Sequence, residues 1–575
     1  MQKMNRQSNI YARWSGPALC AFVAFLVYLP ALQNGFVNWD DGLYITDNPQ
    51  LRALDLAFIK WAFTTNAAAN WHPLTWISYS IEYAFFGREP FVYHLTNVLL
   101  HSANTGLVYI LSKKLADAAG IDGRKSIILA ATAALLFGVH PVHVESVAWI
   151  AERKDVLYGL FILSCLIFYL KYCGSGLARN KSFYALSIIS FILALMSKPM
   201  ALTLPLVLLV LDYYPLKRIN GLKHDITAVL TEKVPFFVLS AISAATTLMA
   251  QDDGGAMVSL DAVPLHLRVL VALKSYIFYL WKLVLPTGLA PFYPYPRVEE
   301  INGFEYIAAA LVFAAVSAAC LFLRRQKLLA AVWVYFVVTL LPVIGIVQVG
   351  TQSAADRYLY LPSLGFFILA GAAMSSVYAF SAERGRSASA KTAVGVFAAL
   401  VLALLSVQTI KQERVWRDSA ALWTHEINLY PALPKGYLYR ASGFHAAGDY
   451  PAAISDLKAA ISLNPSFAMA YNELGIIYGK MGRFDESIAE FGMAIKLDPD
   501  NSSAYNNRGF THYRAGDYSR ALGDFEKAVQ YNPRNGGAYY NMGVAYAKIM
   551  DNANADVNFK KAKDLGVRND SGAID

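Results

Sequence analysis

Two adjacent carboxylates near the N-terminus have the residue types that acid–base chemistry needs. Asp40 and Asp41 follow the first long apolar stretch of the chain, directly after Asn38 and Trp39. A carboxylate beside a cleft can act as a general base when it lies within hydrogen-bond reach of the proton that it takes. Adjacent carboxylates can also hold Mg²⁺ or Mn²⁺ through their oxygens, although we expect no obligatory metal. The alternative is an ordinary solvated loop.

A second polar segment runs from His140 to Asp155 and reads HPVHVESVAWIAERKD. Its His-x-x-His-x-Glu spacing superficially resembles that of metal ligands, but it does not match the HExxH helix pattern of zinc sites. We interpret the segment instead as a mixed-charge rim that binds a phosphorylated headgroup and places an acceptor. Its polar residues are His140, His143, Glu145, Glu152, Arg153, Lys154 and Asp155.

Three further polar features stand at the ends of apolar stretches. Lys198 separates two short ones, and Arg357 and Tyr358 precede a late one. Arginine offers a planar fork of donors that suits a lipid phosphate, whereas the alternative for Arg357 and Tyr358 is anchoring at a membrane interface. His72 lies in the loop that continues from Asp40 and Asp41.

The composition places these residues in a membrane protein with a polar C-terminal part. Of 575 residues, 56% are hydrophobic and only 16% are charged, against about a quarter charged in soluble proteins, which argues against a soluble enzyme. No clustered basic face supports nucleic-acid binding. Apolar runs of spanning length predict eleven spans at residues 15–33, 93–112, 126–141, 155–172, 182–197, 199–212, 233–250, 305–323, 328–347, 360–380 and 391–410.

The orientation of these spans follows from basic residues in alternate loops, such as Lys113-Lys114 and Lys217-Arg218. Because such loops stay in the cytoplasm, the polar loops described above are predicted to face the periplasm or a lumen. If residues 266–285 also crossed the membrane, the later basic loop at Arg324-Arg325 would lie outside the cytoplasm. We therefore interpret these residues as an amphipathic helix at the outer interface, with a twelfth span as the alternative. The first apolar run is predicted to be an uncleaved span rather than a signal peptide.

The C-terminal part repeats itself every 34 residues. The repeated positions are Tyr437, Tyr471, Tyr505 and Tyr539; Pro431, Pro465, Pro499 and Pro533; Gly475, Gly509 and Gly543; and Gly448, Gly482 and Gly516. This period is typical of tetratricopeptide repeats, in which pairs of antiparallel helices stack into a solenoid. The sequence therefore predicts an all-α protein with a transmembrane domain at 1–410, a connecting half-repeat at 411–434 and a solenoid of about four repeats at 435–575, and the repeats favour a protein partner.

Several stretches resemble one known family. They are FVNWDDGLYITDNPQL, NWHPLTWISYSIEYAFFG, YHLTNVLLHSANTGLVY, HPVHVESVAWIAERKD and DRYLYLPSLGF, followed by the repeats. In this order they resemble the TMTC proteins, which are transmembrane and tetratricopeptide-repeat O-mannosyltransferases. That family is similar to the protein O-mannosyltransferases and to the wider GT-C superfamily of glycosyltransferases that use polyprenyl-phosphate sugars.

The resemblance implies a GT-C bundle of about eleven spans with a periplasmic or lumenal active site. It implies that one carboxylate of the acidic pair is the catalytic base, and we favour Asp40. It also implies that Arg357 and Tyr358 contact the donor phosphate, with Lys198 or Arg153. Lys198 is followed by Pro199, where many TMTC proteins have Glu. The residues assigned to the substrate loops are His72, His140, His143, Glu145 and Asp155.

The expected reaction is inverting transfer of mannose or another hexose from a polyprenyl-phosphate donor to Ser or Thr of a protein that docks on the repeats. The expected location is a bacterial inner membrane, with the active site and the repeats in the periplasm. One alternative is a GT-C transferase that acts on a glycan or a lipid. Others are a non-catalytic membrane scaffold that displays the repeats, and a transporter, which would carry charges near the membrane midplane.

Overall fold

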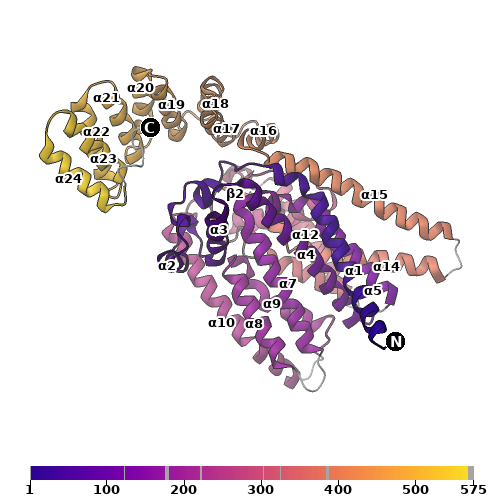
Figure 1. Ribbon diagram of the computed structural model, residues 1–575. Coiled ribbons are helices and arrows are strands. Elements are labelled where there is room, and N and C mark those ends of the chain that lie inside the picture. Colours follow the sequence, from indigo (N-terminus) through magenta and orange to yellow (C-terminus); the bar gives the residue numbers. More distant parts are fainter. Residues whose placement is uncertain are drawn as a thin grey trace. The chain divides into compact units, whose positions relative to one another are not determined.

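The computed structural model describes residues 2–121, 123–174, 180–219, 223–301, 303–323, 326–383 and 388–567. The chain is all-α, as the sequence predicts, apart from two short antiparallel strands, β1 (Tyr293–Pro294) and β2 (Gln352–Ala354) (Figure 1). It divides into two compact units, Met1–Ala421 and Leu422–Asp575, and each is described by itself.

The first unit is a bundle of helices. These are α1 (Gln2–Val27), α2 (Leu56–Thr64), α3 (Pro73–Phe86), α4 (Pro90–Ala118), α5 (Gly123–Val139), α6 (Val144–Ala148), α7 (Arg153–Cys173), α8 (Lys181–Leu195), α9 (Leu204–Tyr213), α10 (Lys223–Asp253), α11 (Leu265–Val284), α12 (Phe304–Phe322), α13 (Lys327–Leu340), α14 (Leu364–Glu383) and α15 (Ala388–Glu413). Helix α4 packs against α1, α5 and α7, and both of its faces therefore contribute to the core.

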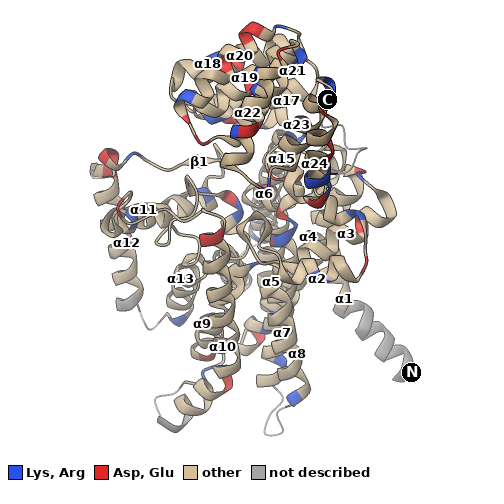
Figure 2. Ribbon diagram, turned by 90° about the vertical axis from the view of Figure 1, so that its left-hand side faces the viewer, with Lys and Arg blue, Asp and Glu red and all other residues tan. Residues whose placement is uncertain are grey.

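Each of the eleven apolar segments predicted as spans contains helical structure, but residues 341–347 and 360–363 of two of them form turns and bends. Among the described residues, three helices are long and apolar enough to cross a membrane: Ile150–Cys173, Ile226–Asp253 and Lys391–Trp416. The bent pair formed by Gly123–Val139 and Pro141–Ala148 gives a fourth if it counts as one span, and six further apolar helices are shorter. The number of eleven spans therefore stays a prediction. In Figure 2, residues coloured as charged are sparse along α7, α9 and α13 except toward their ends.

Residues 266–285 form α11, which is not among the candidate spans. Two of its charged side chains bind backbone near its ends: Arg268 donates to the carbonyl oxygens of Val263, Val258 and Ser259, and Lys282 to those of Thr287 and Gly288. Lys274, in the middle of the helix, pairs with Glu305 at 2.8 Å. Whether this helix lies at the interface or crosses the membrane stays a prediction.

Two prolines stand where helices of the bundle are interrupted and polar residues lie in its interior. The chain bends by 54° between α5 and α6, at His140-Pro141, and a second break between α8 and α9 falls at Lys198-Pro199. Proline disfavours helical geometry in the residue before it, so helices end at both positions. As a result, the segment after Pro141 and the Lys198 side chain enter the interior of the unit.

The second unit consists of paired helices. After α16 (Ser419–Leu429) come the first and second helices of four repeats, which are α17 (Pro434–Ala446) and α18 (Tyr450–Leu463), α19 (Ala468–Lys480) and α20 (Phe484–Leu497), α21 (Ser502–Arg514) and α22 (Tyr518–Tyr531), and α23 (Gly536–Lys548) and α24 (Asn552–Asp564). Residues 568–575 of the predicted solenoid domain lie outside the described part of the chain.

Repeated glycines explain the close packing within each pair. A Cβ atom on Gly475, Gly509 or Gly543 would lie 2.8–2.9 Å from the ring of an aromatic residue on the second helix, as Phe525 does for Gly509. The turn glycines have positive φ, and Met550 takes this place in the last repeat with φ of 63°. Glycine therefore recurs every 34 residues because each repeat needs a residue without a side chain where its two helices meet.

Candidate functional site

Three distant segments of the first unit meet in one group of charged side chains. The carboxylate of Glu152 lies at its centre, with Oε1 3.1 Å from Lys154 Nζ and 3.2 Å from Arg357 Nε, and Oε2 3.4 Å from Lys198 Nζ. One carboxylate thus bridges three cations from the first turn of α7, the break before α9 and the turn after β2. We call the residues Glu145, Glu152, Lys154, Asp155, Lys198 and Arg357 the charged cluster.

Two further ion pairs complete the charged cluster. The Arg357 guanidinium pairs with Glu145, whose other oxygen accepts the backbone N–H of Arg357 at 2.8 Å. The Lys198 ammonium pairs with Asp155, and Asp155 also accepts a hydrogen bond from Ser146 at 3.0 Å. All of these carboxylates are buried. A buried charge is tolerated when it is paired and hydrogen-bonded, so the pairs hold the three segments together.

The two adjacent aspartates have different environments. Asp41 is buried, and its two oxygens accept the backbone N–H groups of Val37 at 2.9 Å and Ala151 at 3.1 Å. It therefore ties its own loop to the segment that carries Glu152. Asp40 is only partly buried and lies in the electrostatic field of Lys154, Glu152 and Arg357. Of the pair, Asp40 is the more exposed carboxylate and the one that lies in the electrostatic field of the charged cluster.

Burial changes the ionisation of both aspartates. It raises the pKa of Asp40, an effect that Lys154 and Arg357 oppose and Glu152 reinforces. It raises the pKa of Asp41 to about 7, while the N–H groups of Val37 and Ala151 lower it. A carboxylate with a raised pKa accepts a proton more readily, which suits a general base.

The aspartate pair does not offer a metal two free carboxylates, because both Asp41 oxygens already accept backbone hydrogen bonds. Lysine and arginine also surround Asp40, and their positive charge disfavours a second cation. Within the described part of the chain, no group of three or more His, Cys, Asp or Glu side chains is arranged to hold a metal ion. These residues do not fit Mg²⁺ or Mn²⁺, and we derive no step through a metal.

His72 lies in an aromatic environment near the charged cluster. Its ring stacks on Tyr44 at 5.5 Å between centroids and lies 4.9 Å from Trp76. Burial, together with the positive charge of Lys154, lowers its pKa to about 3. Neither ring nitrogen has a hydrogen-bond partner among the described residues.

Arg153 is separate from the charged cluster, contrary to the expectation that it serves as a phosphate contact beside Arg357. It is fully buried and pairs with Glu82, and it donates to Asn97 Oδ1 at 2.9 Å and to the carbonyl oxygen of Tyr93 at 2.8 Å. Lys154 takes the place in the cluster instead. Arg153 and Lys154 are adjacent in the sequence, which does not show which of them joins the cluster. In the structure they point in different directions from the first turn of α7, Arg153 to Glu82 and Lys154 to Glu152.

His140 and His143 also lie outside the charged cluster. His140 Nε2 lies 3.2 Å from the carbonyl oxygen of Leu283, and the two ring nitrogens of His143 contact the Phe137 carbonyl oxygen at 2.8 Å and Ser363 Oγ at 3.0 Å. These contacts engage both His143 nitrogens within the protein, so the two histidines position the bend after α5.

Aromatic rings flank the cations. The Tyr358 ring lies 5.0 Å from the Arg357 guanidinium and 5.9 Å from Lys198 Nζ, and its hydroxyl accepts a hydrogen bond from Gln352 at 2.8 Å. Trp39, next to Asp40, packs on Trp149 at 5.2 Å. Cation–π contacts of this kind restrict the direction of a guanidinium or ammonium group.

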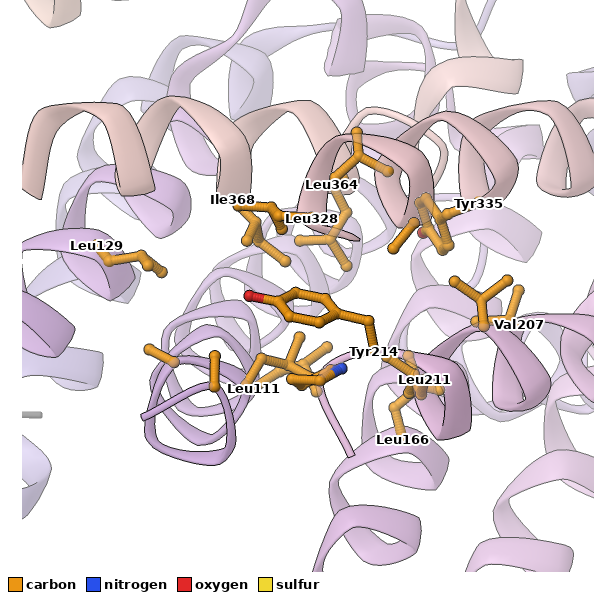
Figure 3. A pocket seen from close by; sticks show the side chains of 18 of the residues that line it. Leu111, Leu129, Leu166, Val207, Leu211, Tyr214, Leu328, Tyr335, Leu364 and Ile368 are labelled. Carbon is orange, nitrogen blue, oxygen red and sulfur yellow. The ribbon is translucent and has the colours of Figure 1, made fainter. Parts of the chain in front are cut away.

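An apolar cavity lies among the helices of the same unit (Figure 3). Tyr214 projects into it, with Leu328 and Ile368 on one side and Leu111 on the other. Tyr335, another lining residue, donates a hydrogen bond of 2.8 Å to the carbonyl oxygen of Leu361. The wall of the cavity is thus tied to Leu361, in the turn before α14. Its lining also includes Leu115, Leu129, Leu166, Val207, Leu211, Val332 and Leu364.

Comparison with known proteins gives matches to repeat families in the C-terminal part and to relatives over most of the chain. Residues 442–482 and 477–516 match the TPR repeat family, and residues 502–535 match the tetratricopeptide repeat family. The human "Protein O-mannosyl-transferase TMTC1" is 26% identical over 80% of this chain and 56% of its own length. The Caenorhabditis elegans "Protein O-mannosyl-transferase F38B6.6" is 23% identical over 72% of this chain and 57% of its own. A Xenopus laevis relative, "Protein O-mannosyl-transferase tmtc2", is 43% identical over 18% of this chain and 12% of its own.

The resemblance to TMTC O-mannosyl-transferases is thereby confirmed over most of the chain, which spans a little over half the length of the human and nematode relatives. Among solved structures, the crystal structure of MamA is 24% identical, covering 26% of this chain and 86% of that one, with a TM-score of 0.24. The crystal structure of YrrB, titled a TPR protein with an unusual peptide-binding site, is 20% identical over 29% of this chain and 84% of that one, with a TM-score of 0.23.

Proposed function

We propose that this protein is a membrane glycosyltransferase that moves a hexose from a polyprenyl-phosphate donor to Ser or Thr hydroxyls of a protein. The observation that carries the proposal is the charged cluster, in which Lys154, Lys198 and Arg357 converge on one buried carboxylate beside Asp40. Three converging cations suit a phosphate group, and a nearby carboxylate with a raised pKa suits proton removal.

The reaction follows from these roles. Asp40 takes the proton of the acceptor hydroxyl as its oxygen forms a bond to the anomeric carbon of the sugar. The bond between that carbon and the phosphate oxygen breaks, and the phosphate leaves with the electron pair. Arg357 and Lys198, with Lys154 in place of Arg153, stabilise the charge that develops on it. A single displacement of this kind inverts the anomeric centre.

The donor is proposed to be a lipid-linked sugar because the charged cluster suits its phosphate. The lipid chain is not assigned to the apolar cavity, whose lining residues Leu115, Ile121 and Tyr214 lie beside the basic loops predicted to be cytoplasmic. Tyr358 contacts both Arg357 and Lys198 and fixes the direction of their donors. Mannose is the sugar proposed first, because the relatives are named O-mannosyl-transferases.

The acceptor is assigned to a protein because tetratricopeptide repeats follow the membrane unit and solenoids of this type present long binding surfaces. The proposed location is a bacterial inner membrane, with the charged cluster and the repeats on the periplasmic side. Alternate basic loops support this orientation.

The test is transfer of labelled sugar by purified protein from a panel of polyprenyl-phosphate and polyprenyl-diphosphate sugars to periplasmic proteins. Asp40→Asn should lower transfer by about 10²–10⁴-fold, as expected for loss of a general base. Asp47→Asn is the matched control, because Asp47 is exposed and bonds only locally to Thr46. Transfer that survives Asp40→Asn would refute the assigned base.

The same assay separates the competing functions. Label on a glycan or lipid instead of protein would move the acceptor class while keeping the chemistry. No transfer from any donor, by folded protein that still captures partners through its repeats, would favour the non-catalytic scaffold. Arg297→Gln, on the exposed surface, controls for loss of one positive charge when Arg357→Gln is tested.

A further inference from the structure

A second group of charged side chains lies toward the other end of α7 from the charged cluster. Asp212 of α9 accepts a hydrogen bond from the Tyr169 hydroxyl at 2.8 Å and pairs with Lys233 of α10 at 2.7 Å. Arg218 pairs with Asp212 at 2.9 Å and with Glu232 at 2.7 Å. Because a helix rises about 1.5 Å per residue, Tyr169 lies about 25 Å from the first turn of α7. This group is therefore separate from the proposed transferase site.

A cavity of about 570 Å³ adjoins this group, and Glu232 is part of its wall. The volume falls within the range of about 300–1,000 Å³ that is typical of small-molecule sites. The other lining residues come from α7, α8 and α10, and they are Tyr172, Lys181, Tyr184, Thr227, Ala228 and Thr231. Lys181 and Glu232 give the lining one positive and one negative side chain.

The negative side of the cavity is held in a fixed direction. Glu232 Oε1 accepts the Tyr172 hydroxyl at 3.1 Å, and Oε2 accepts the Arg218 guanidinium at 2.7 Å. The Tyr184 hydroxyl donates to the carbonyl oxygen of Glu232 at 2.7 Å, and the two tyrosine rings lie 5.1 Å apart. A carboxylate offers about four acceptor sites, and the faces of tyrosine rings also attract cations. This wall therefore suits an ammonium group.

The positive side of the cavity suits a phosphate group. Lys181 is the first residue of α8, is exposed, and directly precedes the span predicted at 182–197. Tyr172 ends the span predicted at 155–172, and Glu232 precedes the one predicted at 233–250. The cavity is thus predicted to lie at the depth of lipid headgroups, on the side of the basic loops, which is the cytoplasmic side.

The two helices beside the cavity continue with exposed apolar side chains. On α8 these are Leu186, Ile189 and Ile192, and on α10 they are Val234, Val238 and Ile242. Their spacing of three or four residues places each set on one face of its helix. Exposed apolar faces within predicted spans suit contact with hydrocarbon chains.

We propose that this cavity binds the headgroup of phosphatidylethanolamine, a zwitterionic phospholipid with a primary ammonium group. Lys181 binds the phosphate, Glu232 accepts N–H groups of the ammonium, and the acyl chains lie along the exposed apolar faces of α8 and α10. The trimethylammonium group of phosphatidylcholine has no N–H to donate, and phosphatidylglycerol has no cation. The inference uses the predicted placement of these helices in a membrane, but it requires neither the sugar donor nor Asp40.

The test is native mass spectrometry of the delipidated full chain in detergent micelles, titrated with phosphatidylethanolamine, phosphatidylcholine or phosphatidylglycerol of identical acyl chains. The first molecule of phosphatidylethanolamine should bind about tenfold more tightly than either other lipid, because hydrogen bonds to a charged group are the stronger ones. Equal affinities for the three lipids, or a preference for phosphatidylglycerol, would overturn the proposal.

Variants of the lining identify the site. Ala228→Phe fills the cavity without a change of charge and should weaken binding of phosphatidylethanolamine about tenfold, whereas Leu230→Phe, on the exposed surface of the same helix outside the lining, should not. Lys181→Gln should weaken binding about fivefold, and its matched control is Lys217→Gln, an exposed cation outside the lining. Glu232→Gln should equalise the affinities for phosphatidylethanolamine and phosphatidylcholine. Equal losses in the lining variants and their controls would contradict the assignment.

Competition distinguishes a lipid from other ligands. Glycerophosphoethanolamine, which has the headgroup without chains, should not displace the lipid at equal concentration, and displacement would show that a free headgroup compound is the ligand instead. Displacement by a polyprenyl phosphate would identify a donor site and would also overturn the proposal. Asp40→Asn should bind phosphatidylethanolamine as well as the natural chain does, so failure of lipid binding and failure of transfer are distinguishable.

Discussion

The ion pair between Arg357 and Glu145 separates a structural role from a role in binding the donor. Arg357→Gln leaves Glu145 without its guanidinium partner, whereas Glu152 keeps Lys154 and Lys198. Glu145 is 3% exposed, and removal of one member of a buried pair costs about 3–5 kcal/mol. The backbone N–H of residue 357 still donates to Glu145. We therefore expect Arg357→Gln to lower the free energy of unfolding by about 3 kcal/mol, at the low end of that range.

The double variant Glu145→Gln, Arg357→Gln removes both charges and leaves two neutral amides of matching size. Replacement of a whole buried ion pair is often close to neutral in stability, so we expect the double variant to recover about 2 kcal/mol of what the single variant loses. Its transfer activity should stay absent, because no guanidinium remains to bind the phosphate. Glu145→Gln alone should keep transfer, since Arg357 still pairs with Glu152.

The measurements are thermal unfolding of the intact protein, followed by tryptophan fluorescence, and transfer of labelled sugar at a temperature where every variant is folded. Transfer restored in the double variant would show that Arg357 acts only through Glu145. Equal unfolding temperatures of the double and single Arg357 variants would show that the lost stability does not come from an orphaned carboxylate.

Three further outcomes follow from local geometry. Burial raises the pKa of Asp41 from 3.8 to about 7. The contribution of its protonated form to stability is therefore present below pH 3.8 and is lost as the pH rises through about 7. In Asp41→Asn, the unfolding temperature should fall less over this pH range than it does in the natural chain. Met550→Gly should stabilise the repeats by about 1 kcal/mol in thermal unfolding, because Met550 has φ of 63° and is 87% exposed; an unchanged transition would contradict this. Gly509→Ala should lower their stability by about 1–3 kcal/mol, since its Cβ would lie 2.9 Å from the Phe525 ring. Gly523→Ala, a helical position with open space around it, should raise their stability instead by about 0.5–1 kcal/mol, and the same sign for both glycine variants would refute the packing argument.

The order of the elements could be predicted from the sequence because it depends on local patterns. Apolar runs predicted helices, and each predicted run contains helical structure. The 34-residue spacing predicted helix pairs, since Gly509 and Phe525 lie within one repeat and meet through neighbouring packing. Pro141 and Pro199 stand at the breaks because proline acts on the residue next to it.

The amino-acid sequence by itself thus determined the helices, the repeats and the residue types available for chemistry. Only the tertiary structure decided which of those residues meet. Arg153 and Lys154 are adjacent in sequence, but successive helical residues differ by about 100° in direction, so one side chain enters the buried network with Glu82 and the other reaches Glu152. The contact of Glu152 with Arg357 joins residues that are far apart in the chain, and it depends on how whole helices pack rather than on any local spacing.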